Sequence, residues 1–164
     1  MEEKVEKNFL DLLEKNQKII HKICRIYSNE EGYKDLFQEI VIQLWKSYSS
    51  FKGESKFTTW MYSVSLNTAM SLFRKVKKHE TKINIELVQD KIKHDEINDD
   101  DEIKVKKMYQ AIHQLNDVDK ALIMMYLDGK DYSEISRILG ITEGNARVKM
   151  NRARNKLKQL IKNR

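Results

Sequence analysis

The sequence predicts an all-α protein, with an N-terminal helical bundle and a C-terminal helix-turn-helix domain joined by a flexible acidic linker. The 164 residues include no proline and only five glycines, the residues that most often interrupt helices. Apolar residues recur every three or four positions over long stretches, which is the period of an amphipathic helix. Residues 86–102 carry eight acidic residues against two lysines, a charge of −6, which leaves +12 for the rest of this chain of net charge +6.

Three helices are expected in the N-terminal domain, which we predict to span residues 1–78. Apolar periodicity places them at about residues 5–27, 34–48 and 58–78. Gly32 marks the break between the first two, and a loop containing Gly53 separates the second from the third. On the third helix, the side chains expected to face the hydrophobic core are Met61, Val64, Thr68, Leu72 and Val76.

Four helices are expected in the C-terminal domain, which we predict to span residues 103–164. They lie at about residues 103–115, 117–127, 132–139 and 142–161. The acidic stretch before them lacks sustained helical periodicity, so we predict a solvated linker over residues 79–102. The alternative is a charged surface loop within a single domain.

Residues that support catalysis or metal binding are not grouped in this sequence. Cys24 is the only cysteine, which excludes an internal disulfide and favours a reduced, partly buried thiol. The four histidines lie far apart, and no phosphate-binding glycine loop or nucleophile–base pair is evident. We therefore expect no enzyme activity, no metal and no cofactor.

Features of membrane insertion and export are also missing from the sequence. The longest purely apolar run, Ala121 to Leu127, is far short of the roughly 20 residues that a membrane helix needs. The N-terminus carries no signal-peptide apolar stretch. We expect a cytoplasmic protein without direct membrane insertion. Its pI of about 9.2 suits a polyanionic partner.

The segment from Asp131 to Leu160 has the pattern of a helix-turn-helix. Gly140 falls where a helix C-cap needs a left-handed residue. Thr142 falls where an N-cap hydroxyl would accept a hydrogen bond from a free amide. Ile141, between Gly140 and Thr142, supplies an apolar side chain to the turn. Two helices joined by such a tight turn form a common DNA-binding unit.

The last helix divides into an apolar and a polar face. The inward face is expected to hold Ala146, Met150, Ala153, Leu157 and Leu160, and the outward face Arg147, Val148, Asn151, Arg152 and Asn155. From Thr142 to Arg164, eight Lys and Arg residues oppose one acid, a charge of +7. Arg can read guanine, Asn adenine and Val a thymine methyl, while Lys149, Arg154 and Lys156 flank that face where phosphates would lie. The alternative is a solvated basic helix that packs on its neighbour.

The middle of the chain is rich in aromatic residues. Phe51, Phe57, Trp60, Tyr62 and Phe73 fall within 23 positions, followed by Arg74, Lys75, Lys77 and Lys78. A helical face holding Ser63, Asn67, Met70 and Arg74 could bind unstacked bases and their backbone. Taken alone, aromatic residues at helical spacing favour a hydrophobic core. We expect Phe57 and Trp60 there, and Phe51 in the Gly53 loop is the better candidate for contacting a base.

The second helix has an apolar residue in the middle of a polar stripe. The stripe holds Asp35, Gln38, Glu39 and Lys46, with Ile42 among them and Trp45 at the edge. Such an arrangement is typical of a partner surface, although single exposed apolar residues are also common.

Three segments together resemble the extracytoplasmic-function (group IV) sigma factors of bacterial RNA polymerase. They are DLFQEIVIQLW (Asp35 to Trp45), FKGESKFTTWMYSVSLNTA (Phe51 to Ala69) and the helix-turn-helix, in the order and spacing of the family. The resemblance implies a non-catalytic subunit that directs core polymerase to promoters by −10 melting and −35 recognition. The implied partners are promoter DNA, the clamp of the largest polymerase subunit and the flap of the second-largest. An anti-sigma factor that could hold the protein at the membrane is a further implied partner.

The resemblance also assigns roles to residues. Asp35, Gln38, Glu39, Ile42 and Trp45 resemble the face that binds the polymerase clamp. Phe51, Lys52 and the loop after them, together with Asn67 on the Ser63, Met70 and Arg74 face, resemble the pocket for a flipped base of the −10 element. The −35-reading positions correspond to Asn145, Arg147, Val148, Lys149, Asn151 and Arg152.

The alternative function is a stand-alone helix-turn-helix regulator with an N-terminal dimerisation or sensor domain. The function of such a regulator does not require aromatic residues and a basic tail beside the polar face that contains Ile42. Tight binding to core polymerase, combined with poor binding of the free protein to duplex DNA, would distinguish the two.

Overall fold

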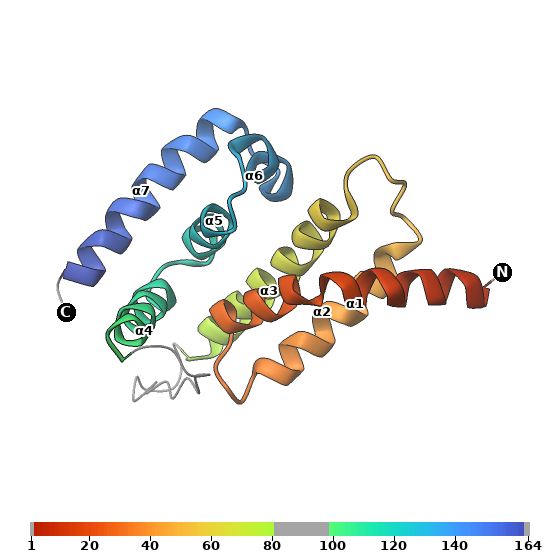
Figure 1. The fold of residues 1–164 in the computed structure, drawn as a ribbon, viewed down its shortest axis with the longest axis horizontal. Helices are drawn as coiled ribbons and strands as arrows, with labels where there is room; N and C mark the ends of the chain where they lie inside the picture. The colour runs from red at the N-terminus through yellow and green to blue at the C-terminus, as the bar shows by residue number, and fades with distance from the viewer. Residues whose placement is uncertain (1, 81–98, 163–164) are drawn as a thin grey trace. The chain divides into compact units, whose positions relative to one another are not determined.

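A computed structural model of the chain describes residues 2–80 and 99–162, which form seven helices and no strand (Figure 1). Contacts between residues divide the chain into two compact units, Met1–Phe73 and Arg74–Arg164. The all-α prediction is therefore confirmed. Most of the predicted linker, residues 81–98, lies outside the described residues.

The first unit is built from α1 (Glu2–Tyr27), α2 (Tyr33–Tyr48) and the first part of α3 (Phe57–Glu80). Helices α1 and α2 pack against each other on either side of a short connection, in which the Gly32 amide donates to Asn29 Oδ1 at 2.8 Å. Apolar side chains from all three helices are buried between them. They are Phe9, Ile20, Ile23, Cys24, Ile26, Tyr27, Leu36, Ile40, Leu44, Met61, Tyr62, Leu66, Ala69 and Met70.

Helix α3 buries a different face from the one that the sequence pattern indicates. Met61 is fully buried as expected, but Val64 and Thr68 are only half-buried and Val76 is 54% exposed. The buried face carries Tyr62, Leu66, Ala69 and Met70. Both faces have helical spacing, and the observed one removes larger apolar side chains from water, which gives the greater hydrophobic stabilisation.

The second unit contains α4 (Asp99–His113), α5 (Asp117–Leu127), α6 (Tyr132–Leu139) and α7 (Glu143–Lys162). Helix α7 packs against the other three. Helix α4 begins four residues earlier than expected, at Asp99. Its first turn includes Asp101, whose carboxylate lies 3.3 Å from Lys104 Nζ. The helix dipole favours acidic residues at the N-terminus of a helix. The spacing of apolar residues does not indicate this stabilisation, so it places the start of the helix too late.

The hydrophobic core of the second unit centres on α5. Ala121, Leu122, Ile123, Met124 and Met125 are all buried, because this helix is surrounded within its unit. Side chains from the neighbouring segments complete the core: Ala111, Ile112, Leu115, Ile135, Ile138, Ala146, Met150 and Ala153. None of the helices in the described ranges is both long enough and apolar enough to cross a membrane.

Candidate partner-binding and nucleic-acid interfaces

One face of α2 remains exposed to solvent while the opposite face is packed. Asp35 and Gln38 are exposed, and Ile42 and Trp45 are 44% and 45% exposed. Glu39 in the same stripe is half-buried and accepts a hydrogen bond from Gln43 Nε2 at 2.7 Å. The five predicted partner-binding residues therefore share one surface, which we call the α2 stripe (Asp35, Gln38, Glu39, Ile42 and Trp45). It combines carboxylates with apolar side chains.

Six aromatic rings form a continuous cluster, which we call the aromatic cluster. It shares Trp45 with the α2 stripe. Phe9 is 2% exposed, and its ring centroid lies 5.0 Å from those of Trp45 and Tyr48. Tyr48 in turn lies 6.2 Å from Trp60. The members are Phe9, Trp45, Tyr48, Phe51, Phe57 and Trp60. It joins α1, α2, the loop after α2 and the start of α3.

Phe51 belongs to this cluster and does not project freely from its loop. Its ring lies 5.1 Å from Trp60 and 5.8 Å from Phe57, and the residue is half-buried. Phe57 and Trp60 are also half-buried, so the expectation that they lie in the core while Phe51 stands apart does not describe the arrangement. The loop turns at Gly53, whose φ of 72° favours glycine, and its Lys52 is exposed.

The predicted base-binding face of α3 is only partly available to solvent. Asn67 and Arg74 are exposed and Ser63 is half-buried, but Met70 is 8% exposed and belongs to the hydrophobic core. Asn67 follows Trp60 by seven residues, two helical turns or about 10 Å along the axis. Phe51 contacts Trp60 at the start of this helix, and the expectation that Phe51 and Asn67 share one pocket stays a prediction.

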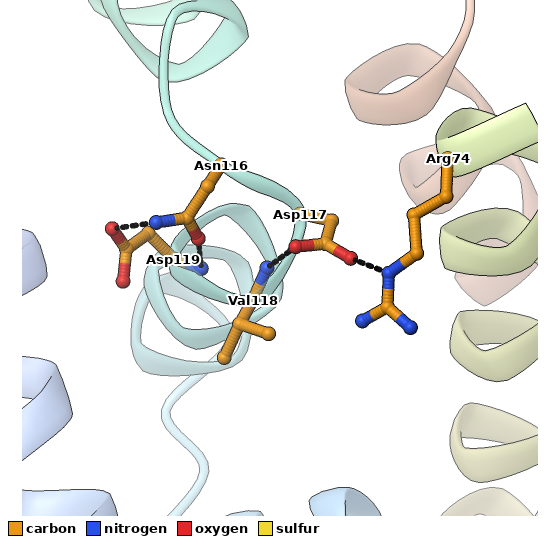
Figure 2. A network of polar contacts seen from close by, with 5 residues as sticks. All are labelled: Arg74, Asn116, Asp117, Val118 and Asp119. Atoms are coloured by element: carbon orange, nitrogen blue, oxygen red, sulfur yellow. Dashed lines mark hydrogen bonds and ion pairs between the residues drawn. The ribbon is translucent and has the colours of Figure 1, made fainter. Parts of the chain in front are cut away.

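A polar network at the start of α5 includes Arg74, one of the predicted −10 residues (Figure 2). Arg74 Nε donates to Asp117 Oδ2, and Asp117 Oδ1 accepts from the Val118 amide at 3.0 Å. Asn116 Oδ1 accepts from the Asp119 amide at 2.8 Å, which caps the helix. The Arg74 side chain already has a carboxylate partner, which no spacing in the sequence indicates.

The helix-turn-helix has the capping interactions that its sequence predicts. Gly140 adopts the left-handed conformation (φ 65°, ψ 35°), and the Ile141 amide donates to the Ser136 carbonyl at 3.1 Å, closing α6. Thr142 Oγ1 accepts from the Asn145 amide at 3.2 Å, opening α7. Asp131 caps the N-terminus of α6 by accepting from the Glu134 amide at 2.7 Å. These contacts fix the angle at which α7 leaves the turn.

The predicted outward face of α7 is exposed along its length. Ala146, Met150 and Ala153 are completely buried, and Leu157 and Leu160 are half-buried. The opposite side carries exposed Asn145, Arg147, Val148, Asn151, Arg152 and Asn155, with Lys149 half-buried at its edge. The helix thus presents guanidinium, amide and apolar groups on one surface, the combination that can read base edges in a major groove.

Two arginines of α7 stack on tyrosine rings, in contacts that no spacing in the sequence indicates. The Arg147 guanidinium carbon lies 4.4 Å from the Tyr132 ring centroid, and that of Arg154 lies 4.9 Å from the Tyr126 ring centroid. Arg147 Nη2 also lies 3.9 Å from Glu143 Oε2. Both tyrosines come from other helices of the unit, so only the fold brings these pairs together.

Cys24 is a structural residue of the first unit. It is fully buried, and this burial raises the pKa of its thiol from 9.0 to about 12. Burial also raises the pKa of Tyr33, whose hydroxyl is hydrogen-bonded to His21 Nδ1. A buried thiol with a raised pKa holds little of the reactive thiolate. Within the described ranges, His, Cys, Asp and Glu do not form a group of three that could hold a metal ion.

Both the helices that carry the α2 stripe and the C-terminal helix-turn-helix match known protein families. Residues 12–79 match the family model for sigma-70 region 2, and residues 106–157 match that for sigma-70, region 4. The sigma-E factor of Haemophilus influenzae, an ECF RNA polymerase sigma factor, is 26% identical over 94% of this chain and 88% of its own length. The chain belongs to the extracytoplasmic-function sigma factors.

Other sigma factors of this group have similar sequences over most of the chain. The sigma-E factor of Escherichia coli K12 is 25% identical over 87% of this chain and 84% of its own length. SigW of Bacillus subtilis is 25% identical over 94% and 89%. The protein is therefore an RNA polymerase sigma factor that directs transcription from promoters. A stand-alone regulator is not supported, because the N-terminal helices match sigma-70 region 2.

Two solved structures share the fold. The sigma factor RpoE of Bartonella quintana, solved in complex with the anti-sigma factor NepR, superposes with a TM-score of 0.76 at 22% identity, covering 95% of this chain and 98% of its own. CnrH, solved in complex with the cytosolic domain of CnrY, gives a TM-score of 0.68 at 16% identity, covering 96% and 89%. Both likenesses support the helical architecture.

Proposed function

We propose that this sigma factor divides promoter recognition between its two ends. Residues 1–78 bind core polymerase and the −10 element, residues 103–164 bind the −35 element, and residues 79–102 connect them. The observation that carries this proposal is the exposure of one polar face on α2 and another on α7, while the opposite faces of both helices are packed. The protein acts by binding and positioning, and we expect no catalysis by its own residues.

The α2 stripe is the proposed site for the clamp of the largest polymerase subunit. Ile42 and Trp45 are apolar, nearly half exposed, and flanked by the carboxylates Asp35 and Glu39. An apolar centre with a polar rim is the usual anatomy of a protein interface. Phe9 beneath Trp45 holds that side chain against α1, so the apolar part of the stripe is preorganised.

The test of this site is a pair of matched substitutions. Ile42→Asp places a charge in the centre of the stripe, and loss of a buried interface anchor often costs about 2 kcal/mol or more, roughly a 30-fold rise in Kd. Val5→Asp is the control, because Val5 is equally exposed on α1, at 45% against 44%. Binding of each variant to purified core polymerase should be weakened only by Ile42→Asp. Equal binding by both variants would mean that the α2 stripe is ordinary surface.

The −10 element is proposed to meet the first unit at two successive places. The aromatic cluster offers stacking surface at Phe51 and Trp60, next to exposed Lys52. Asn67, two turns further along α3, offers an amide to another base edge. Because Trp60 and Asn67 are two turns apart on α3, about 10 Å along its axis, we assign the aromatic cluster and Asn67 to neighbouring nucleotides of the unpaired strand. Met70 is left out of this site because it is buried.

The −35 element is proposed to lie against the exposed face of α7. Arg147 and Arg152 would grip guanine edges, Asn145 and Asn151 would read adenine, and Val148 would contact a thymine methyl. Lys149 at the edge of this face, with the exposed Lys156, would contact phosphates. The caps at Gly140 and Thr142 hold the helix at a fixed angle, which base reading requires.

An anti-sigma factor is the proposed regulatory partner, since the structurally similar sigma factor RpoE of Bartonella quintana was solved in complex with one. Such a partner would keep the protein from polymerase by covering the α2 stripe or the α7 face. Binding of the anti-sigma factor and of core polymerase is then expected to be mutually exclusive in a pull-down with purified components. Formation of a complex containing all three would contradict this mode of inhibition.

A further inference from the structure

Arg147, near the start of α7, lies close to two other side chains. Its guanidinium carbon lies 4.4 Å from the Tyr132 ring centroid, and its Nη2 lies 3.9 Å from Glu143 Oε2. The three side chains line a cleft of about 460 Å³, together with Tyr126, Lys130 and Ile135. Tyr132 is the first residue of α6, so two helices contribute to the surroundings of this arginine.

The ring and the carboxylate restrain Arg147 to different extents. At 3.9 Å the pair with Glu143 is longer than a hydrogen bond, and both side chains are more than half exposed, at 62% and 51%. Exposed pairs of this kind hold a side chain weakly. Tyr132 is half-buried and fixed by the capped start of α6, so the ring is the firmer restraint.

Stacking on a ring leaves an arginine able to read a base. A guanidinium carries five N–H donors in its plane, and an aromatic ring covers its face without using them. Arg147 can therefore keep its contact with Tyr132 while presenting a pair of donors to guanine O6 and N7. An arginine restrained in this way has less rotamer freedom to lose when it binds.

We propose that Tyr132 is a positioning residue for −35 recognition, which holds the Arg147 guanidinium in the orientation that reads one base pair. This inference rests on the proposed role of α7. In the described part of the chain, no ring is stacked against Arg152 on the same exposed face. Arg152 is therefore an internal comparison, because its base preference does not depend on Tyr132.

The experiment compares Tyr132→Leu with Tyr132→Phe in the holoenzyme, using promoters randomised over the −35 element. The base pair read by Arg147 is first identified as the position where Arg147→Ala loses preference. At that position, Tyr132→Leu should lower the preference about two- to fivefold, the range for an exposed cation–π contact, and Tyr132→Phe should retain it. Preference at the position read by Arg152 should stay unchanged in both variants.

A double-mutant cycle separates positioning from general stability. In an Arg147→Ala background, Tyr132→Leu should have no further effect on preference at that base pair. Thermal unfolding checks that each variant is folded. If Tyr132→Leu does not fold, Tyr132→Met, which also lacks a ring, takes its place. A uniform loss at every position, or an equal loss in Tyr132→Phe, would overturn the inference. If Arg147→Ala itself leaves every preference unchanged, the proposed −35 role of Arg147 is wrong.

Discussion

The two candidate DNA-reading surfaces differ in how ready their side chains are before DNA arrives. On α7 the predicted base-reading residues Arg147, Val148 and Arg152 already project into solvent. Around the start of α3, by contrast, Phe51, Phe57 and Trp60 are half-buried and in contact with one another. One surface is open and basic, whereas the other is aromatic and packed on itself.

The difference follows from the chemistry of the two tasks. Base edges in an intact duplex are polar, so they are read by charged and amide groups that are stable when exposed to water. An unpaired base is bound largely by stacking, which needs apolar rings, and rings exposed to water tend to pack together. We infer that the −35 surface binds without rearrangement, while the aromatic cluster exchanges ring–ring contacts for ring–base contacts.

The largest expected effect of a single substitution is on the stability of the packed surface. Phe9→Ala removes a ring that is 2% exposed and contacts both Trp45 and Tyr48. It should lower the free energy of unfolding of the first unit by about 3–5 kcal/mol. Asn151→Ala, on the exposed face of α7, should change stability by less than about 0.5 kcal/mol. Denaturant unfolding followed by circular dichroism measures both, and similar small values would break the comparison.

A moderate effect is expected when a base-reading group on the open surface is removed. Arg152→Ala should reduce discrimination at a single −35 base pair by about 1–3 kcal/mol, because one two-pronged contact is lost. The fold should be unchanged, since the side chain is exposed. Competition binding of the holoenzyme to single-base −35 variants gives the discrimination at each position. A loss spread evenly over all positions would assign Arg152 to the phosphate backbone.

The smallest effect is expected for a phosphate contact. Lys156→Ala should weaken binding to all promoter sequences alike and reduce the slope of log K against log salt by about one, because one fewer counterion is released. Titration of the holoenzyme at several salt concentrations measures this slope. A change in base preference with an unaltered slope would place Lys156 among the base-reading residues instead.

How far the sequence predicts the structure also differs between the two surfaces. In the helix-turn-helix, Gly140 and Thr142 have local roles that depend on neighbouring residues only, and both have the predicted geometry. The division of α7 into two faces follows from helical periodicity in the same way. On α3, two apolar faces have helical spacing, and only packing within the first unit decides that Met70 is buried while Val64 is half-buried.

Contacts between side chains on different helices are not indicated by the sequence pattern. Tyr132 and Arg147 are fifteen positions apart, on different helices, and no spacing rule relates them. Phe9 likewise reaches Trp45 and Tyr48 from a helix that the motif segments do not include. Such contacts depend on how helices cross, which the periodicity of one helix does not specify.

The division of labour between the two surfaces can be tested with two variants and two templates. The Phe51→Leu, Asn67→Ala double variant keeps an apolar side chain in the aromatic cluster, and Arg152→Ala alters only the α7 face. Each is joined to core polymerase and assayed for run-off transcription from a fully paired promoter and from one mismatched over the −10 element. The double variant should transcribe poorly from the paired template and recover activity on the mismatched one, because unpairing no longer has to be driven. The defect of Arg152→Ala should persist on both templates. Equal recovery of the two variants, or recovery of neither, would contradict the account.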